Sequence, residues 1–415
     1  MMLNKDGPVN LSERYVILDV LRGIALLGIC LANYQEFSLY SFQDKAVVEA
    51  MPTASIDHIW TYFHYIFIEG KFYSLFSLLF GIGFSIILSK ITENNQYGFA
   101  VFYRRMMILA IIGFMHLILL WAGDIVVLYA LVGLLLPLFR NVSDKKLLII
   151  SAALLCFPIA LDTFKVLTDH RFTLMIPVEK ALLYLNAKNG ITSDNFSLWL
   201  LEGKSYPEVL KFNLSGSFIR CQEFIEGSRA FKVLGLFILG LYVGRNKLYA
   251  RLNEHTALLK KIRNVGFWAG LPLSCLFAWN AVDGHLGLIA GSTIYALSVT
   301  PMSLSYIAAI CLWFMKHQDK KIFTIMAAPG RMALSNYIGQ SVMGMILFYG
   351  IGFKLALTGL VYVVMMAAGV FVLQVVCSNV WLHYFRFGPL EWIWRMLTYG
   401  QWLRISRDGV SSVHS

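Results

Sequence analysis

The chain has 415 residues, of which 58% are hydrophobic and only 14% are charged, and its mean hydropathy is +0.65. Soluble domains carry about 25% charged residues, so this composition excludes an ordinary soluble protein. The net charge of +11 comes from basic residues spread over many short segments, which argues against nucleic-acid binding. The six cysteines form no CxxC pair or Cys/His cluster, so neither a metal site nor a disulfide framework is predicted.

Repeated apolar runs of about 20 residues predict an all-α polytopic membrane protein with about ten transmembrane helices. The expected spans lie near residues 15–33, 57–89, 103–121, 124–140, 147–166, 229–247, 264–282, 288–315, 331–352 and 356–382. The second run is too long for one straight crossing and contains Glu69-Gly70-Lys71. This interruption indicates a kink, or a re-entrant piece followed by a span.

The Lys and Arg residues at the span ends determine the expected orientation. With a cytoplasmic N-terminus, the short extracytoplasmic connections hold almost no basic residues, Lys45 and Lys354 being the exceptions. This positive-inside pattern predicts that both termini are cytoplasmic. The chain then divides into an N-terminal membrane half over 1–166, an extracytoplasmic loop with short helices over 167–228 and a C-terminal membrane half over 229–415.

The first span carries three polar residues that lie close to one helix face. Arg22 and Asn33 return to within about 20° of each other and are separated by about 16 Å along the axis. A charge near the middle of a membrane helix costs roughly 2.5–3.5 kcal/mol and usually faces protein or a water-filled cavity. Two interpretations stay open. Asp19 and Arg22 form a pair that only fixes helix packing, or they mark the cytoplasmic approach to a polar cavity with Asn33 at its outer end.

The second span offers Asp57, His58, His64, Glu69 and Lys71. Asp57 and His58 are expected at the outer rim, where they are either solvated or functional. Glu69 and Lys71 are expected deep in the membrane, where they form a mutual ion pair with some snorkelling. A buried carboxylate with a raised pKa is also a reasonable general base, so Glu69 is a candidate for that role.

Polar residues of the third and ninth spans also allow two interpretations each. Arg105 and His116 are eleven residues apart and share a face, which places His116 near the outer end. His116 is either a hydrogen-bonded packing residue or an acid–base group. Asn336 and Gln340 are expected to form hydrogen bonds across helices. Arg331 lies at the cytoplasmic end of the ninth span, where it could meet an anionic ligand or headgroup.

Three blocks of these residues resemble the YeiB-like family of bacterial inner-membrane proteins, and together they cover nearly the whole chain. The first block holds Arg14, Leu18-Asp19, Leu21-Arg22-Gly23 and Asn33. The second holds Gly70-Lys71-Phe72, Leu75-Phe76, Phe80-Gly81, Arg104-Arg105, His116 and Trp121-Ala122-Gly123-Asp124. The third, which resembles the domain of unknown function 418, holds Gly330-Arg331, Asn336-Tyr337, Gln340, Tyr384-Phe385-Arg386 and Gly388-Pro389-Leu390-Glu391-Trp392. The resemblance implies a multi-pass protein of the bacterial cytoplasmic (inner) membrane.

The resemblance extends distantly to transmembrane acyltransferases, including the lysosomal heparan-glucosaminide N-acetyltransferases. Those enzymes move an acetyl group from cytosolic acetyl-CoA onto a sugar across the membrane. Asn33 matches their functional Asn at the outer end of the first span. Their catalytic His follows shortly after that Asn, whereas the corresponding spacing in this chain falls on Asp44. His58, Glu69 or His116 would then have to supply the base, or the chemistry differs.

The resemblance and the polar residues together define a candidate site. The candidate catalytic residues are Asn33, His116, Glu69, His58 and Asp19. The candidate acyl-CoA-binding residues are Arg22, Arg104, Arg105, Arg331 and Lys71. In this interpretation basic side chains hold the CoA phosphates, an amide donates to the developing oxyanion, and a carboxylate or imidazole accepts the proton.

Three functions remain open at this point. The first is a membrane-bound O- or N-acyltransferase that uses acyl-CoA as co-substrate and acts on an extracytoplasmic glycan, lipid or small-molecule acceptor. The second is a transporter or flippase for a small solute or lipid, with buried charged residues along its path. The third is a membrane scaffold whose polar residues serve packing alone. Membrane lipids are expected partners, nucleic acid and metal are not, and homo-oligomer formation is left open.

Overall fold

The computed structural model describes residues 15–94, 99–169 and 175–407, which form helices joined by turns. Within these ranges the isolated bridge between Phe385 and Ser406 is the only strand-type pairing. Arg14, the first residue of the resemblance, lies outside the described ranges. The predicted all-α class is therefore confirmed.

The longer helices form the bundle itself, and shorter ones connect them or cover its ends. The longer helices are α1 (Val16–Phe37), α3 (Ala54–Phe67), α4 (Lys71–Asn94), α5 (Phe99–Leu119), α7 (Asp144–Leu167), α11 (Tyr206–Ile225), α12 (Arg229–Arg245), α13 (Thr256–Val282), α14 (Leu288–Lys316), α16 (Ala333–Phe348) and α17 (Leu360–Tyr384). The shorter ones are η2 (Tyr40–Phe42), α2 (Lys45–Glu49), α6 (Val126–Gly133), η3 (Leu136–Phe139), α8 (Ile176–Asn189), α9 (Ser193–Phe196), α10 (Trp199–Glu202), η4 (Leu248–Ala250), α15 (Lys321–Arg331) and α18 (Pro389–Tyr399).

Seven helical segments among the described residues are long and apolar enough to cross a membrane. They are Val16–Phe37, Ala54–Ser89, Phe99–Leu119, Asp144–Leu167, Thr256–Val282, Leu288–Lys316 and Leu360–Tyr384. The other three expected spans, over 124–140, 229–247 and 331–352, correspond to shorter elements: α6 with η3, α12, and α16. The membrane class is thus confirmed, and the total of ten crossings stays a prediction.

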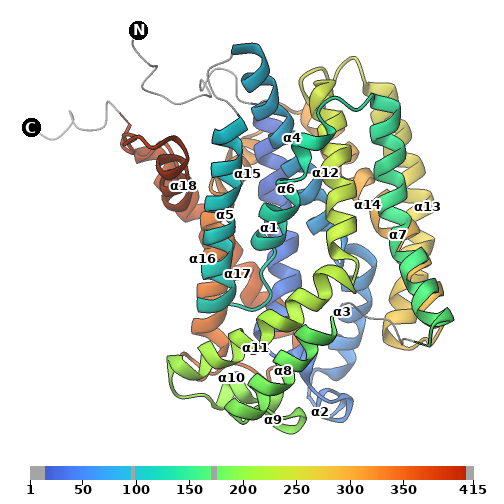
Figure 1. The fold of residues 1–415 in the computed structure, drawn as a ribbon, viewed down its shortest axis with the longest axis vertical. Coiled ribbons are helices and arrows are strands. Elements are labelled where there is room, and N and C mark those ends of the chain that lie inside the picture. Colours follow the sequence, from blue (N-terminus) through green and yellow to red (C-terminus); the bar gives the residue numbers. More distant parts are fainter. Residues whose placement is uncertain (1–14, 95–98, 170–174, 408–415) are drawn as a thin grey trace, which may run out of the picture.

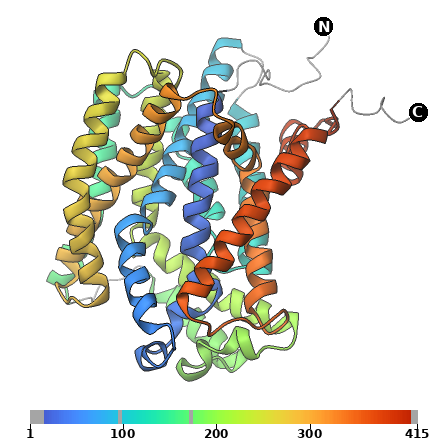
Figure 2. The same cartoon turned by 180° about the vertical axis from the view of Figure 1, so that it is seen from behind.

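Helix α1 occupies the centre of the bundle, where α4, α14, α15, α16 and α17 pack against it. Figure 1 shows α8, α10 and α11 gathered at one end of the bundle, and α18 toward the other. The view from behind in Figure 2 shows α1, in dark blue, running between these two ends. We call them the α11 end and the α18 end. The central position explains why α1 is largely buried although it carries charged residues.

The long second span is broken, as the sequence predicts. Helix α3 ends at Phe67 and α4 begins at Lys71. Gly70 has a φ of +76°, which favours glycine, and a Cβ atom there would lie 2.7 Å from the hydroxyl oxygen of Tyr295. The break places Glu69 between two helices, so its side chain does not follow the face of either one.

Asp57, in α3, caps the N-terminus of α17. Its side chain is buried, one carboxylate oxygen accepts the Val361 N–H at 2.9 Å, and the other accepts the Thr53 hydroxyl at 2.7 Å. Val361 belongs to the first turn of α17, whose N–H groups lack partners within the helix. The rim position expected for Asp57 therefore holds a buried cap that joins α3 to α17 rather than a solvated carboxylate.

Two glycines allow α1 and α15 to touch backbone to backbone. A Cβ atom at Gly330 would overlap the carbonyl oxygen of Asp19, and one at Gly23 would overlap the carbonyl oxygen of Met326. Small residues permit this close approach in membrane bundles. The contact fixes the height and rotation of α1 at the point where the side chains of Asp19 and Arg22 project from it.

Gly330→Ala should destabilise the protein because the added methyl group has no room against the backbone of α1. Overpacking of this kind costs about 1–3 kcal/mol. We expect a lower melting temperature and a smaller monodisperse fraction in detergent, measured by fluorescence-detected size exclusion after heating. Gly369→Ala in α17 is the matched control, because a Cβ atom there meets nothing within 4 Å. Equal stability of the two variants would contradict the tight contact.

Candidate functional site

A cavity of about 910 Å³ lies beside α1, and its lining includes residues of α1, α4, α5, α6, α12, α14, α15, α16 and α18. Along α1 its lining extends from the N-cap residue Tyr15 to Glu36. That separation corresponds to about 30 Å of helix, close to the thickness of the hydrocarbon core of a bilayer. The cavity therefore follows α1 between the α18 end and the α11 end of the bundle.

Basic side chains gather where the cavity meets the α18 end. We call this group the basic end; its members are Arg22, Arg105, Lys247, Arg331 and Arg395. Asp19 lies among them and accepts a hydrogen bond from Arg22 at 2.9 Å. The two residues are thus paired and also line a cavity, so the pair does more than fix helix packing, and its cytoplasmic position stays a prediction. The excess of positive charge suits a ligand that carries several negative charges.

Helix α18 forms part of the wall at the basic end. The guanidinium group of Arg105 stacks over the ring of Trp394 at 3.9 Å, and the indole N–H of Trp394 donates to the carbonyl oxygen of Arg105 at 2.9 Å. Glu391 accepts the N–H of Leu334 at 2.7 Å and the hydroxyl of Ser335 at 2.6 Å. Burial raises the pKa of the Glu391 carboxyl, and these hydrogen bonds from Ser335 and Leu334 oppose the rise. The carboxylate thus attaches α18 to the first turn of α16.

Acidic, basic and amide side chains line the cavity toward the α11 end. We call this group the polar end; its members are Asn33, Glu36, Glu69, Arg229 and Lys232. The Asn33 amide faces the cavity and forms no hydrogen bond with any residue in the described ranges. An amide in that state keeps both N–H groups available for a ligand.

Glu69 is supported by a histidine behind it. The Nε2 atom of His64 lies 3.2 Å from a carboxylate oxygen of Glu69, and its Nδ1 atom lies 2.9 Å from the amide nitrogen of Gln35. An amide nitrogen only donates, so Nδ1 accepts and the ring proton sits on Nε2, directed at Glu69. The side chain of Glu69 is 39% exposed, whereas that of His64 is 6% exposed. Glu69 therefore faces the cavity while His64 holds its orientation.

Helix α11 closes the polar end with a network of ion pairs. Arg220 lies 2.6 Å from Glu223 and 3.7 Å from Glu36, and Arg229 lies 3.4 Å from Glu223. The Nε–H of Arg220 also donates to the carbonyl oxygen of Ala122 at 3.1 Å. Because Arg220 is buried and bound on three sides, α11 is fixed against the bundle and not loosely associated with it.

The first turn of α11 is itself stabilised by a capping box between Ser205 and Glu208. The carboxylate of Glu208 accepts the backbone N–H groups of Lys204 at 2.7 Å and of Ser205 at 3.1 Å. These backbone hydrogen bonds hold the pKa of Glu208 below its usual value. Helix α11 therefore has a defined start at Ser205.

His116 does not line the cavity. Its Nδ1 atom lies 2.7 Å from Asp124 and its Nε2 atom lies 2.8 Å from the hydroxyl of Ser341, and all three side chains are buried. The second carboxylate oxygen of Asp124 accepts the N–H of Val127 at 2.7 Å, in the first turn of α6. The order Ser–His–Asp resembles a hydrolase triad. Here the three residues join α16, α5 and the start of α6, which favours the packing interpretation of His116.

His116→Ala should therefore lower the stability of the folded protein. The change leaves Asp124 and Ser341 buried without their shared partner, a loss worth about 3 kcal/mol. We expect a clear drop in melting temperature, measured in detergent by intrinsic fluorescence. His58→Ala serves as the control because His58 is exposed and contacts the ring of Tyr62. A His116→Ala protein with unchanged melting temperature would contradict this role.

Three further predicted residues also lie outside the cavity lining. His58 is exposed on α3, and Arg104 is exposed on α5 next to the cavity-lining Arg105. Lys71 is fully buried; its ammonium group donates to the carbonyl oxygen of Tyr65 at 2.6 Å and lies over the ring of Phe277 at 5.2 Å. The cavity brings together the other predicted residues, which are Asp19, Arg22, Asn33, Glu69, Arg105 and Arg331.

The amide pair of the ninth span performs the interhelical role that the sequence allows. Asn336 donates to the hydroxyl of Ser378 at 3.0 Å, and Gln340 donates to Gln374 at 3.0 Å. Both partners lie on α17, so the amides join α16 to α17. Such hydrogen bonds contribute about 0.6–2 kcal/mol each in membrane bundles.

Sequence reasoning missed several residues of the polar end. Glu36 follows Asn33 by three positions and shares its face, so the helical period could have found it. Arg229 and Lys232 lie at the start of α12, toward the α11 end. Two basic residues at the expected outer end of a span depart from the positive-inside pattern, and that departure was the available signal.

Comparisons with known proteins agree with the resemblance drawn from the sequence. Residues 243–401 match the family described as "Protein of unknown function (DUF418)". The chain is 28% identical to the uncharacterized protein YxaH of Bacillus subtilis (strain 168), over 96% of this chain and 98% of that protein. It is 27% identical to the uncharacterized protein YeiB of Escherichia coli (strain K12), over 93% and 96% respectively. No solved structure matches the chain significantly.

Proposed function

We propose that this YeiB-like membrane protein is an acyltransferase that moves an acyl group from cytosolic acyl-CoA to an extracytoplasmic glycan, lipid or small molecule. One observation carries the proposal: a single cavity beside α1 joins the basic end to Asn33 and Glu69 at the polar end. The basic residues gathered at the α18 end support a cytoplasmic position for that end in the bacterial inner membrane. Donor and acceptor would then enter the same cavity from opposite sides.

The basic end has the chemistry to hold the phosphates of acyl-CoA. Arg22, Arg105 and Arg331 each offer a planar guanidinium group, which forms paired hydrogen bonds with phosphate oxygens. Stacking on Trp394 restricts the Arg105 side chain before any ligand arrives, which lowers the entropy lost on binding. From Arg22 to Asn33 the path along α1 is about 16 Å, which an extended pantetheine arm can cover.

The polar end has the groups that acyl transfer requires. The acceptor hydroxyl or amine attacks the thioester carbonyl carbon while Glu69 takes its proton. Asn33 donates a hydrogen bond to the carbonyl oxygen as negative charge develops there. The carbon–sulfur bond then breaks and the CoA thiolate leaves. Glu69 passes its proton to this thiolate. The products are the acylated acceptor and free CoA, so the step is balanced.

The experiment is a measurement of acetyl-CoA binding and turnover with the purified full-length protein. Binding would be followed by isothermal titration calorimetry in a neutral detergent. Turnover would be followed in proteoliposomes with radiolabelled acetyl-CoA outside and a bacterial cell-envelope extract inside. We expect saturable binding and label transferred into the extract. Absence of both, with palmitoyl-CoA also failing to bind, would overturn the proposal.

A transporter or flippase is the second candidate, and the helix break at Glu69 favours it. Discontinuous helices place charged groups and backbone at the substrate site of many transporters. Asp19 and Glu69 both line the cavity, whereas Lys71 and His116, which a charge pathway would also use, do not. Counterflow of a solute in proteoliposomes that contain no acyl donor would support transport over acyl transfer.

A further inference from the structure

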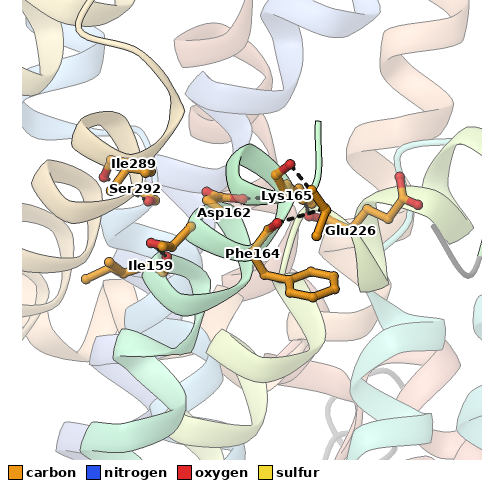
Figure 3. A network of polar contacts seen from close by, with 9 residues as sticks. Ile159, Asp162, Phe164, Lys165, Glu226, Ile289 and Ser292 are labelled. Atoms are coloured by element: carbon orange, nitrogen blue, oxygen red, sulfur yellow. Dashed lines mark hydrogen bonds and ion pairs between the residues drawn. The ribbon is translucent and has the colours of Figure 1, made fainter. Parts of the chain in front are cut away.

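Lys232 is a basic residue of the polar end. It lines the cavity, and its ammonium group lies over the ring of Tyr295 at 4.5 Å. No hydrogen bond or ion pair joins it to any residue in the described ranges. Lys165 at the same end is the contrast: it donates to Asp162 at 3.3 Å and to the carbonyl oxygen of Glu226 at 2.7 Å, as Figure 3 shows. A charge inside a membrane bundle normally has such partners.

The carboxylates around Lys232 are already engaged elsewhere. Glu223 pairs with Arg220 and Arg229, and Glu36 also pairs with Arg220. Glu69 is held by His64. The ammonium group of Lys232 is therefore a donor of three hydrogen bonds that faces open space rather than a protein acceptor.

Arg229 and Tyr295 complete a potential binding surface around this ammonium group. Arg229 lies one helical turn before Lys232 on α12 and also lines the cavity. Among the described residues it makes one ion pair, although a guanidinium group has five N–H donors. The hydroxyl of Tyr295 is hydrogen-bonded to Tyr73 and lies against Gly70, next to Glu69 in the helix break. The three side chains thus converge beside the proposed base.

We infer that Lys232, Arg229 and Tyr295 form an oxyanion subsite that binds a phosphate or carboxylate group of the acyl acceptor. The inference rests on the proposed function and specifies its acceptor as an anionic molecule. Binding of the anion at Lys232 would hold the acceptor beside Glu69, where its hydroxyl or amine can lose a proton. A neutral acceptor would leave the Lys232 charge without a partner, so the subsite also discriminates against neutral molecules.

The test measures binding of two anionic probes, glycerol 3-phosphate and glucuronate, to the full-length protein by isothermal titration calorimetry without acyl-CoA. Lys232→Met should weaken binding of the preferred probe about tenfold or more, because one charge-assisted contact is lost. Lys232→Arg should stay within about threefold of the wild type, since the charge and donors remain. The probe that binds tighter distinguishes a phosphate-bearing from a carboxylate-bearing acceptor.

Two matched variants make the result specific. Lys165→Met removes the same charge at the same end and should not change probe affinity. Arg105→Gln removes a charge at the basic end and shows whether a probe binds there instead. Tyr295→Phe, which keeps the ring under Lys232, should weaken binding and remains informative if Lys232→Met does not fold. Binding that depends on Arg105 and not on Lys232, or no saturable binding of either probe, would overturn the subsite. Acetyl-CoA binding, measured separately, would still report on the proposed function.

Discussion

Glu69→Gln is expected to lower the rate of acyl transfer about 10²–10⁴-fold, the range that a positioned general base contributes. Glutamine keeps the size of the side chain and can still accept the hydrogen bond from His64, so the fold should be retained. It cannot take a proton from the acceptor. Acetyl-CoA affinity should stay within about twofold, because the basic end is unchanged. The measurement is transfer of radiolabel from acetyl-CoA in proteoliposomes, alongside calorimetric binding.

His58→Gln is the matched control for this experiment. His58 is a base candidate from the same stretch of sequence, but it is exposed and lies outside the cavity. Its replacement should leave transfer unchanged. If Glu69→Gln retained more than half of the wild-type rate, or if His58→Gln lost activity equally, Glu69 would not be the base.

Arg105→Gln should weaken acetyl-CoA binding about tenfold or more, while Arg104→Gln should stay within about twofold. The two residues are adjacent, but Arg105 lines the cavity and stacks on Trp394, whereas Arg104 is exposed. A hydrogen bond to a charged group contributes about 1.5–3 kcal/mol, which corresponds to the expected change. Calorimetric titration of both variants at two salt concentrations checks the result.

The salt dependence gives this comparison a second readout. Binding of a polyanion to a basic cavity weakens as salt rises, and removal of one contributing charge makes the dependence shallower. Only Arg105→Gln should show the shallower dependence. Equal losses in the two variants would mean that general surface charge, and not the cavity, attracts the ligand.

The features that the sequence predicted best are those that lie on a single element. Asp19, Arg22 and Asn33 share a face of α1, and the helical period alone is enough to show it. The break near Glu69 was also predictable, because Gly70 and two charges interrupt an apolar run that exceeds one crossing. In both cases the information is local, so no tertiary contact had to be known.

Features that depend on neighbouring helices could not be predicted. Arg105 and His116 share a face of α5, yet Arg105 lines the cavity and His116 is buried against Ser341. The periodicity fixes which face a residue occupies, but not which helix covers that face at a given depth. Near Arg105 the face meets α18 and open space, and eleven residues later it meets α16.

The close contact of Gly23 and Gly330 limits how this molecule can change shape. Two helices whose backbones touch cannot slide or rotate against each other without a steric clash, so α1 and α15 have to travel as one rigid unit. Widening of the basic end would then have to come from its other walls, one of which is α18, held on α5 through the stacked pair of Arg105 and Trp394.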